Sequence, residues 1–244
     1  MHTMNMMDSL GIAHCGVYRD SADRKERYPL LIERKGVKIA LLNYTYGTNG
    51  IPVPAPLTVN FIDKEQMAKD IADAKLMKPD AIIACMHWGE EYVSTPPRHI
   101  KELTDWLLEQ GVDHIMGNHP HVVQPMEMRS DSLTAKRSAV TYSLGNLISG
   151  MYARGRDGGL LVRVGLVKIY DICWLGSLEY ALTWVARPER DGYNNFTILP
   201  ADTTLVHSAT GRRKMQQFIE DTRTLFKRYN IGAVKEYKIE PACQ

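Results

Sequence analysis

"DKEQMAKDIADAKLMKPDAIIACMHWGEEYVSTPPRHIKELTDWLLEQGVDHIMGN" (residues 63–118) alternates amphipathic segments with short β-rich runs. The run "AIIACM" (81–86) is continuously apolar, as strands buried on both faces are. "DHIMG" (113–117) is the next predicted strand, and each strand follows a segment with helical spacing of its apolar residues. Helix, strand, helix, strand is the order of a layered α/β unit with a parallel pair of strands.

Cap residues mark the ends of both predicted helices. Asp63 is a typical N-cap residue, and Gln66 stands at the capping-box position. Thr95-Pro96 predicts an N-cap followed by the first helical residue of the second helix. Gly111 predicts the end of that helix.

Outside residues 63–118 the pattern is richer in strands. The runs 28–34 and 37–46 flank Lys35-Gly36 and predict a hairpin, and the Gly- and Pro-rich segment 47–56 predicts a loop. Five further strands and a long helix are expected, at residues 122–128, 138–144, 159–170, 177–186, 195–200 and 208–229. We therefore expect one α/β domain over residues 1–200 and a C-terminal helical tail over 201–244.

Composition excludes several classes of protein. The 244 residues carry a net charge of +2, so no strong field favours nucleic acid or an anionic membrane. The four cysteines lie far apart without a Cys-x-x-Cys pair, which argues against a zinc ribbon. No apolar run reaches the roughly 18 residues of a membrane span. The opening residues have no signal-peptide pattern, so the chain as written is expected to be soluble.

Three histidines follow the two predicted parallel strands. His87 comes directly after 81–86, and His119 and His121 come after 113–117. Ligands of open α/β sheets bind beyond the carboxyl ends of the strands, so these imidazoles are expected at one rim. Each histidine alone is more often an ordinary hydrogen-bonded residue. The three together predict a site for divalent metal, with zinc, iron or manganese as candidates.

Two carboxylates follow His87 by three and four residues. Adjacent carboxylates are most often part of a solvated turn. Because Glu90 and Glu91 lie in the loop that leads away from the predicted site, one of them could orient an imidazole or act as a general base. We favour Glu91 over Glu90 for this role.

Two polar stretches end other predicted strands. "TYSLGN" (141–146) offers Ser143 and Asn146, which would bind substrate, or would form a plain Gly-Asn turn. "NYTYGTNG" (43–50) is similar, and its candidate substrate-binding residues are Asn43, Tyr44 and Asn49.

Four of these stretches together resemble the motifs of the bacterial capsule-synthesis CapA family, which is associated with poly-γ-glutamate production. They are "YTYGTNG", "HWGEEY", "GVDHIMGNHPHVVQPME" and "YSLGN", in the family's order, and the likeness spans about residues 8–150. The resemblance implies a layered α-β-β-α sandwich similar to the calcineurin-like metallophosphoesterases. It also implies one or two metal ions, with His87 and His119 binding one ion and His121 the other. A centre of this kind would hydrolyse phosphate esters, with His87 and Glu91 as catalytic residues.

The sequence departs from the family pattern near its start. The family's Gly-Asp strand end and its Asn-Asn-His motif are not found, and "SLGIAHCG" (9–16) is similar to the segment that follows Asn-Asn-His. Smaller departures are Asn118 within the histidine motif and Leu147 after Gly-Asn. We therefore expect an N-terminally incomplete copy of the fold, or a chain whose site is completed by a partner.

The resemblance leaves several functions open. The leading expectation is a CapA-like protein of capsule or poly-γ-glutamate biosynthesis with a metal-dependent phosphoesterase site. The alternatives are a non-catalytic assembly or transport component of an envelope polymer machinery, or an inactive truncated copy. The expected partner is that machinery, and the expected location of the complete family form is the cell envelope.

Overall fold

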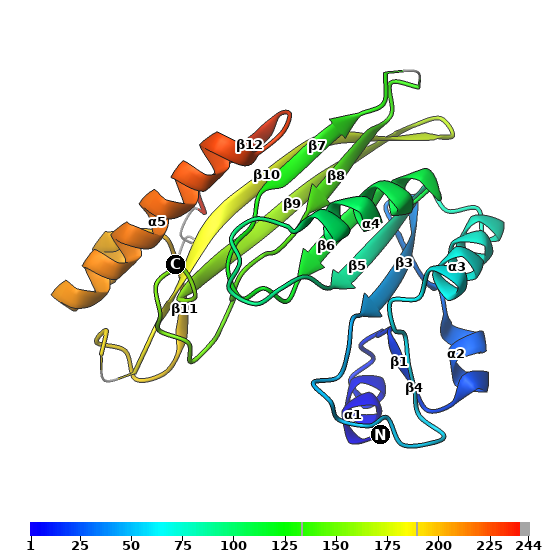
Figure 1. Ribbon diagram of the computed structural model, residues 1–244, viewed down its shortest axis with the longest axis horizontal. Helices are drawn as coiled ribbons and strands as arrows, with labels where there is room; N and C mark the ends of the chain where they lie inside the picture. Colours follow the sequence, from blue (N-terminus) through cyan, green and yellow to red (C-terminus); the bar gives the residue numbers. More distant parts are fainter. Residues whose placement is uncertain (133, 189, 240–244) are drawn as a thin grey trace. The chain divides into compact units, whose positions relative to one another are not determined.

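The computed structural model describes residues 1–132, 134–188 and 190–239. Backbone contacts divide the chain into two compact units. The first consists of residues 1–88, 99–116 and 168–173, and the second of 89–98, 117–167 and the residues from 174 onward. The chain is a mixed α/β protein with several sheets and a long C-terminal helix, which confirms the predicted class (Figure 1). The finer arrangement of four layers and the boundary at residue 200 stay predictions.

The first unit contains four helices and six strands among its described residues. Its helices are α1 (His2–Ser9), α2 (Ser21–Arg27), α3 (Lys64–Leu76) and α4 (Arg98–Glu109). Its strands are β1 (Val17–Tyr18), β2 (Leu30–Arg34), β3 (Val37–Thr45), β4 (Thr58–Val59), β5 (Ala81–His87) and β6 (His114–Asn118). The main strands follow the order β2-β3-β5-β6, and β1 pairs with β4. Both α4 and β6 extend into the second unit by one or two residues.

The predicted hairpin at Lys35-Gly36 is confirmed. Strands β2 and β3 pair antiparallel, and the two turn residues have φ of 51° and 75°. Two positive φ angles are what a two-residue hairpin turn of the favoured hand requires. Strand β3 also pairs in parallel with β5, and the last partners in that register are Thr45 and His87. The parallel pairing brings the polar end of β3 beside His87.

The N-cap of α3 is confirmed, but the capping box is wrong. The Asp63 carboxylate accepts a hydrogen bond of 2.8 Å from the backbone N–H of Gln66. The Gln66 side chain does not return to the cap; its Nε2 donates to Asp70 Oδ1 at 3.0 Å. Asp70 is only 2% exposed, so its carboxylate needs donors more than the exposed cap does.

The start of α4 also differs from its prediction. The helix begins at Arg98 and not at Pro96. A residue that precedes proline is sterically pushed out of the helical region, and Pro96 precedes Pro97. The predicted end near Gly111 is confirmed, with φ of 97° at that glycine.

A buried polar network lies within the first unit around Asp70. Its carboxylate accepts two hydrogen bonds from Arg24 Nη2, at 2.9 and 2.7 Å. The Tyr44 hydroxyl donates to the same carboxylate at 2.9 Å, and Tyr44 is fully buried. Together with Gln66, these donors compensate for the burial of a charged group.

The second unit contains the remaining strands and the long helix. They are β7 (Met126–Ser130), β8 (Arg137–Thr141), β9 (Gly158–Ile169), β10 (Ile172–Ala186), β11 (Thr197–Pro200), the short 3₁₀ helix η1 (Thr203–Leu205), α5 (Ala209–Tyr229) and β12 (Val234–Glu236). Strands β7 and β8 pair antiparallel. Strand β10 pairs with β9, with β11 and, in parallel, with β12. The tip of the β9–β10 hairpin, residues 168–173, belongs to the first unit.

Most strands predicted for this unit exist, with two differences. The run predicted from residue 122 becomes a strand only at Met126, after Pro125, which has no N–H for a ladder hydrogen bond. Strand β12 was not predicted, because three residues carry too little periodic signal.

Helix α5 packs on the sheet around β10 (Figure 1). Ser208 caps the helix by accepting a hydrogen bond of 2.9 Å from the Gly211 N–H. The Phe226 and Tyr180 rings meet edge to face, with centroids 4.9 Å apart. A Cβ at Gly158 would lie 2.7 Å from the Phe218 ring, so glycine is needed there. None of the described helices combines the length and apolar character needed to cross a bilayer.

Candidate metal centre

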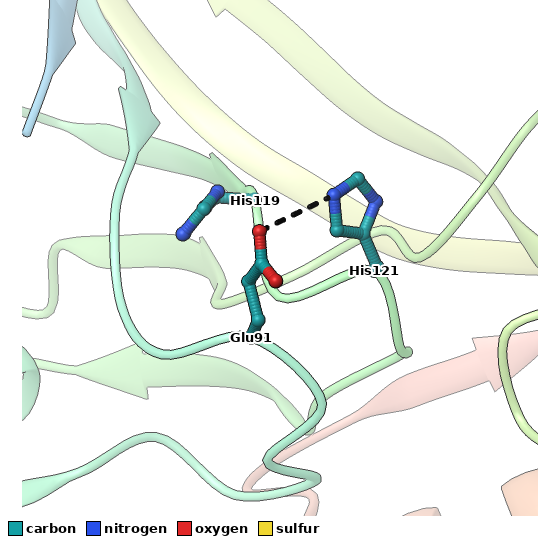
Figure 2. Close-up of side chains that lie close together, drawn as sticks. All are labelled: Glu91, His119 and His121. Carbon is teal, nitrogen blue, oxygen red and sulfur yellow. Dashed lines mark ion pairs between the residues drawn. The ribbon is translucent and has the colours of Figure 1, made fainter. Parts of the chain in front are cut away.

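Three side chains with metal-binding atoms meet in the loops of the second unit. Glu91 lies in the loop after β5, and His119 and His121 follow β6. Their ligand atoms all lie within 4.8 Å of one another. Figure 2 shows the Glu91 carboxylate between the two imidazole rings. All three residues had been predicted as site residues.

Two hydrogen bonds hold the Glu91 loop against the histidine loop. The backbone N–H of Tyr92 donates to the Pro120 carbonyl at 2.8 Å. The Gln124 side-chain amide donates to the Val93 carbonyl at 2.7 Å. Because Tyr92 and Val93 follow Glu91 directly in the chain, these hydrogen bonds hold the Glu91 carboxylate near the histidines.

The backbone of this site is strained. His119, His121 and Tyr92 have φ angles of 118°, 58° and 67°. Non-glycine residues rarely adopt such angles, and each costs roughly 1–3 kcal/mol unless surrounding contacts enforce it. These residues are three of the eight non-glycine residues with positive φ in the described part of the chain. Strain of this kind concentrates at functional sites.

Asn146 fixes the orientation and the tautomer of His121. The amide Nδ2 of Asn146 donates to the carbonyls of Arg156, at 2.8 Å, and of His121, at 3.2 Å. Its Oδ1 therefore faces His121 Nδ1, at 2.9 Å, as an acceptor. His121 Nδ1 must carry the proton, and the lone pair of Nε2 is available to a metal.

Asn146 is itself positioned by the start of β9. Its backbone N–H donates to the Gly158 carbonyl at 3.0 Å. A Cβ at Gly159 would lie 2.8 Å from the carbonyl carbon of Asn146, so the close approach of the two segments requires glycine. The Gly-Asn pair at 145–146 thus does more than form a turn.

Burial favours the neutral form of the His119 imidazole. His119 is 6% exposed, and burial lowers the pKa of its imidazole below the ordinary value of 6.5. The Glu91 carboxylate opposes this shift, and the His121 ring adds to it. Glu91 Oε1 lies 4.0 Å from His121 Nε2, and both side chains reach solvent. A neutral imidazole is the form that binds a metal.

The donor set fits one first-row metal ion. Two imidazoles and a carboxylate bind zinc in many catalytic sites and iron in others. Around such an ion, ligand atoms about 2.1 Å from the metal lie roughly 3 to 3.5 Å apart. The 4.0 Å between Glu91 and His121 is close to this separation, and the exposed Glu91 side chain can change rotamer to shorten it.

The other predicted residues of the second unit lie close by. Ser143 is fully buried, and its hydroxyl donates to Asn118 Oδ1 at 3.3 Å. The Ser143 carbonyl accepts from the Gln124 N–H, so this residue supports the histidine loop. Its predicted contact with substrate stays a prediction.

The remaining predicted residues belong to the first unit. His87 is exposed and stacks on Tyr46, with ring centroids 5.8 Å apart. Asn49 is exposed, and its Oδ1 accepts a hydrogen bond from the Tyr46 hydroxyl. The backbone N–H of Asn43 donates to the Tyr28 hydroxyl. Tyr44 contributes its hydroxyl to the Asp70 network, a placement that gives no support to a substrate contact. The predicted roles of these residues, including His87 as a metal ligand, stay predictions.

Two residues beside the histidines were missed. The Tyr92 ring stacks on His121, with centroids 6.1 Å apart, and the Arg156 guanidinium lies 3.3 Å from the centroid of Tyr92. Tyr92 closes the quoted motif "HWGEEY", so its position next to Glu91 was a usable signal. Arg156 lies in "ARGRDGG", which has no pattern that indicates a site.

Fold and site together define a mixed α/β protein with one candidate His/Glu metal centre in the described part of the chain. A family model described as bacterial capsule synthesis protein PGA_cap matches residues 1–151. The chain belongs to this capsule synthesis family.

Two curated relatives support the assignment. The PGA biosynthesis protein CapA of Bacillus subtilis (strain 168) is 29% identical over 157 residues, which cover 63% of this chain and 38% of that protein. The capsule biosynthesis protein CapA of Bacillus anthracis is 30% identical over 135 residues, which cover 52% of this chain and 31% of that protein. The matched region therefore spans about a third of the length of these relatives.

Solved structures resemble the chain only weakly. The Haemophilus influenzae NAD nucleotidase NadN aligns with a TM-score of 0.43 and 12% identity, over 94% of this chain and 38% of its own. The sulfate thiohydrolase SoxB of Thermus thermophilus aligns with a TM-score of 0.39 and 14% identity, over 91% and 35%. Because both scores lie below 0.5, these likenesses define neither the fold nor the site.

Proposed function

We propose that this protein acts in capsule or poly-γ-glutamate biosynthesis as a metal-dependent hydrolase of phosphate esters. The place in capsule production is supported by the family and by both Bacillus relatives, which are capsule or PGA biosynthesis proteins. The observation that carries the hydrolase is the fixed tautomer of His121, which directs a free lone pair toward Glu91 and His119. A histidine that only filled space would not need this second hydrogen bond to orient it.

Each residue of the centre has a role in the proposal. His119, His121 and Glu91 would hold one divalent ion, with zinc, manganese or iron as candidates. An ion held there would lower the pKa of a water molecule to give a nucleophile and would neutralise charge on a phosphoryl oxygen. Asn146 orients His121, and burial keeps His119 neutral and ready to bind. Glu91, exposed at the edge of the centre, can also accept a proton.

His87 enters the proposal through its motif alone. The family resemblance implies that it is a further metal ligand. In the first unit its ring is exposed and stacked on Tyr46.

The proposed partners and location follow from capsule chemistry. A capsule polymer is built at the cell envelope, so we place the protein with the machinery that makes or exports poly-γ-glutamate or another envelope polymer. The alternative is a non-catalytic role in that machinery, and the experiment below distinguishes it from hydrolysis.

Metal content and hydrolysis test the proposal. The purified 244-residue chain should retain about one divalent ion per molecule and release phosphate from p-nitrophenyl phosphate. His119→Ala and His121→Ala should remove both properties. His99→Ala, which removes an exposed histidine on α4, should preserve them. Bound metal without hydrolysis would favour the non-catalytic role, and hydrolysis that survives His121→Ala would contradict the site.

A further inference from the structure

A pocket of about 320 Å³ opens next to the metal centre within the second unit. Tyr92 and Val122 form its side toward the centre, Arg154 and Arg156 contribute from the loop before β9, and Leu225 contributes from α5. The Tyr92 ring is shared, because it contacts His121 by stacking and also lines the pocket. A molecule bound in the pocket would therefore lie one aromatic ring away from His121.

The two arginines of the pocket differ in their electrostatic environment. Arg154 forms two hydrogen bonds of 2.7 Å with the carboxylate of Asp221 on α5, so its charge is balanced. Arg156 is half-buried and stacks on Tyr92, and within the described part of the chain it makes no ion pair with a carboxylate. A half-buried guanidinium with no anion attracts one.

The position of Arg156 is coupled to the centre through its backbone as well. Its carbonyl accepts the 2.8 Å hydrogen bond from Asn146 Nδ2, the amide that orients His121. Its guanidinium carbon lies over the Tyr92 ring, 3.3 Å from the centroid, and the guanidinium carries N–H donors that can meet an oxyanion. The same residues therefore fix the metal-binding imidazole and this cation.

We propose that this pocket, which we call the Arg156 pocket, binds an anionic group of the substrate beside the phosphate that is hydrolysed. The inference rests on the proposed function: the substrate would be a phosphate ester that carries a second oxyanion, either a carboxylate or another phosphate. Arg156 is the group that recognises the oxyanion, in the planar, two-pronged manner of guanidinium groups. Val122 and Leu225 provide apolar contacts for the carbon skeleton that joins the two anionic groups.

Asp221 sets the affinity of the pocket. Its carboxylate lies on the pocket wall and balances Arg154, so it also repels an incoming anion. Removal of this charge should strengthen anion binding, while removal of Arg156 should weaken it. Opposite effects of two neighbouring substitutions are hard to produce by general loss of structure.

Equilibrium binding to the metal-free 244-residue chain tests the pocket apart from the metal centre. Inorganic phosphate and glutamate are titrated separately by calorimetry after treatment with chelator. At least one should bind, Arg156→Gln should weaken it roughly tenfold or more, and Asp221→Asn should strengthen it about threefold. The ligand that shows the Arg156 dependence identifies the oxyanion as phosphate or carboxylate.

Two matched variants separate the pocket from its surroundings. His119→Ala removes a proposed metal ligand that does not line the pocket, so it should leave anion binding unchanged. Arg228→Gln removes another arginine that stacks on a tyrosine, Tyr229, on the same unit and should also have no effect. Absence of binding by both ligands, or equal binding by Arg156→Gln and the native chain, would overturn the inference. Neither result would affect metal content, which tests the proposed function independently.

Discussion

Replacement of Asn146 by leucine tests the link between the fixed tautomer of His121 and metal binding. Leucine has a similar size, but it cannot accept a hydrogen bond from His121 Nδ1 or donate hydrogen bonds to the carbonyls of His121 and Arg156. Loss of a partner that orients a metal-binding histidine typically weakens metal binding 10- to 100-fold, or about 1.4–2.8 kcal/mol. We expect a loss in this range, because the Nε2 tautomer would then compete with the Nδ1 tautomer.

The same substitution affects folding. The Asn146 side chain makes three hydrogen bonds of 2.8–3.2 Å to protein groups, to Arg156, to the His121 carbonyl and to the His121 ring. At about 1 kcal/mol each, their loss would lower the free energy of unfolding by about 3 kcal/mol, with some recovery from the added apolar burial. Stability must therefore be measured with affinity.

Three measurements separate a loss of metal affinity caused by the tautomer from one caused by loss of folding stability. Denaturant titration gives the unfolding free energy, calorimetry with Zn²⁺ or Mn²⁺ gives the affinity, and ¹⁵N chemical shifts of the imidazole give the tautomer. Ser143→Ala removes a nearby buried hydroxyl that does not touch His121, so it should leave the tautomer and the affinity unchanged. The reasoning fails if His121 keeps its proton on Nδ1 in Asn146→Leu, or if the folded variant binds metal as tightly as the native chain.

Three further predictions concern stability and are measured by denaturant titration. Asp70→Ala should lower the free energy of unfolding by about 3 kcal/mol, because it removes the shared acceptor of a buried polar network and leaves the half-buried Arg24 without its partner. Exposed Asp73→Ala on the same helix should cost less than about 0.5 kcal/mol, and equal costs would count against the network. Burial lowers the pKa of His119 below 6.5, so as the pH falls below that value the unfolded chain binds the proton first and stability declines. His119→Gln should flatten part of this decline, and an unchanged pH profile would refute the assigned shift. Gly36→Ala should lower the free energy of unfolding by about 1 kcal/mol, because the backbone φ of 75° is unfavourable for alanine. No atom lies within 4 Å of the added Cβ, so a steric clash would not contribute. Unchanged stability would show that backbone strain is not the reason for glycine at this position.

Local signals in the sequence were enough for most elements. Lys35-Gly36, the Asp63 cap and the end of α4 near Gly111 all depend on residues that are neighbours in the chain. The Gln66 side chain could not be predicted from its neighbours in the chain. Its capping-box role competes with a buried carboxylate whose need for donors depends on Arg24, 46 residues away in sequence from Asp70.

The candidate site was predictable in part for the same reason. His119, His121 and Glu91 were identified by residue type and by their place after strands. The substrate contact predicted for Tyr44 rests on its place in a polar stretch, and alternation along β3 puts its side chain on the buried side with Ala40 and Leu42. Arg156 could not be foreseen, because only the folded chain places its guanidinium on Tyr92.

The strained backbone helps to explain why this centre needs so many supporting contacts. Pro120 favours an extended conformation for the residue before it, yet His119 has a φ of 118°. The Tyr92–Pro120 and Gln124–Val93 hydrogen bonds, and the Asn146 amide on His121, are the contacts that offset this cost. A loop selected only for stability would place glycine or asparagine at such angles. Imidazoles at two strained positions, each close to one carboxylate, support the metal-binding role that we propose for the histidines.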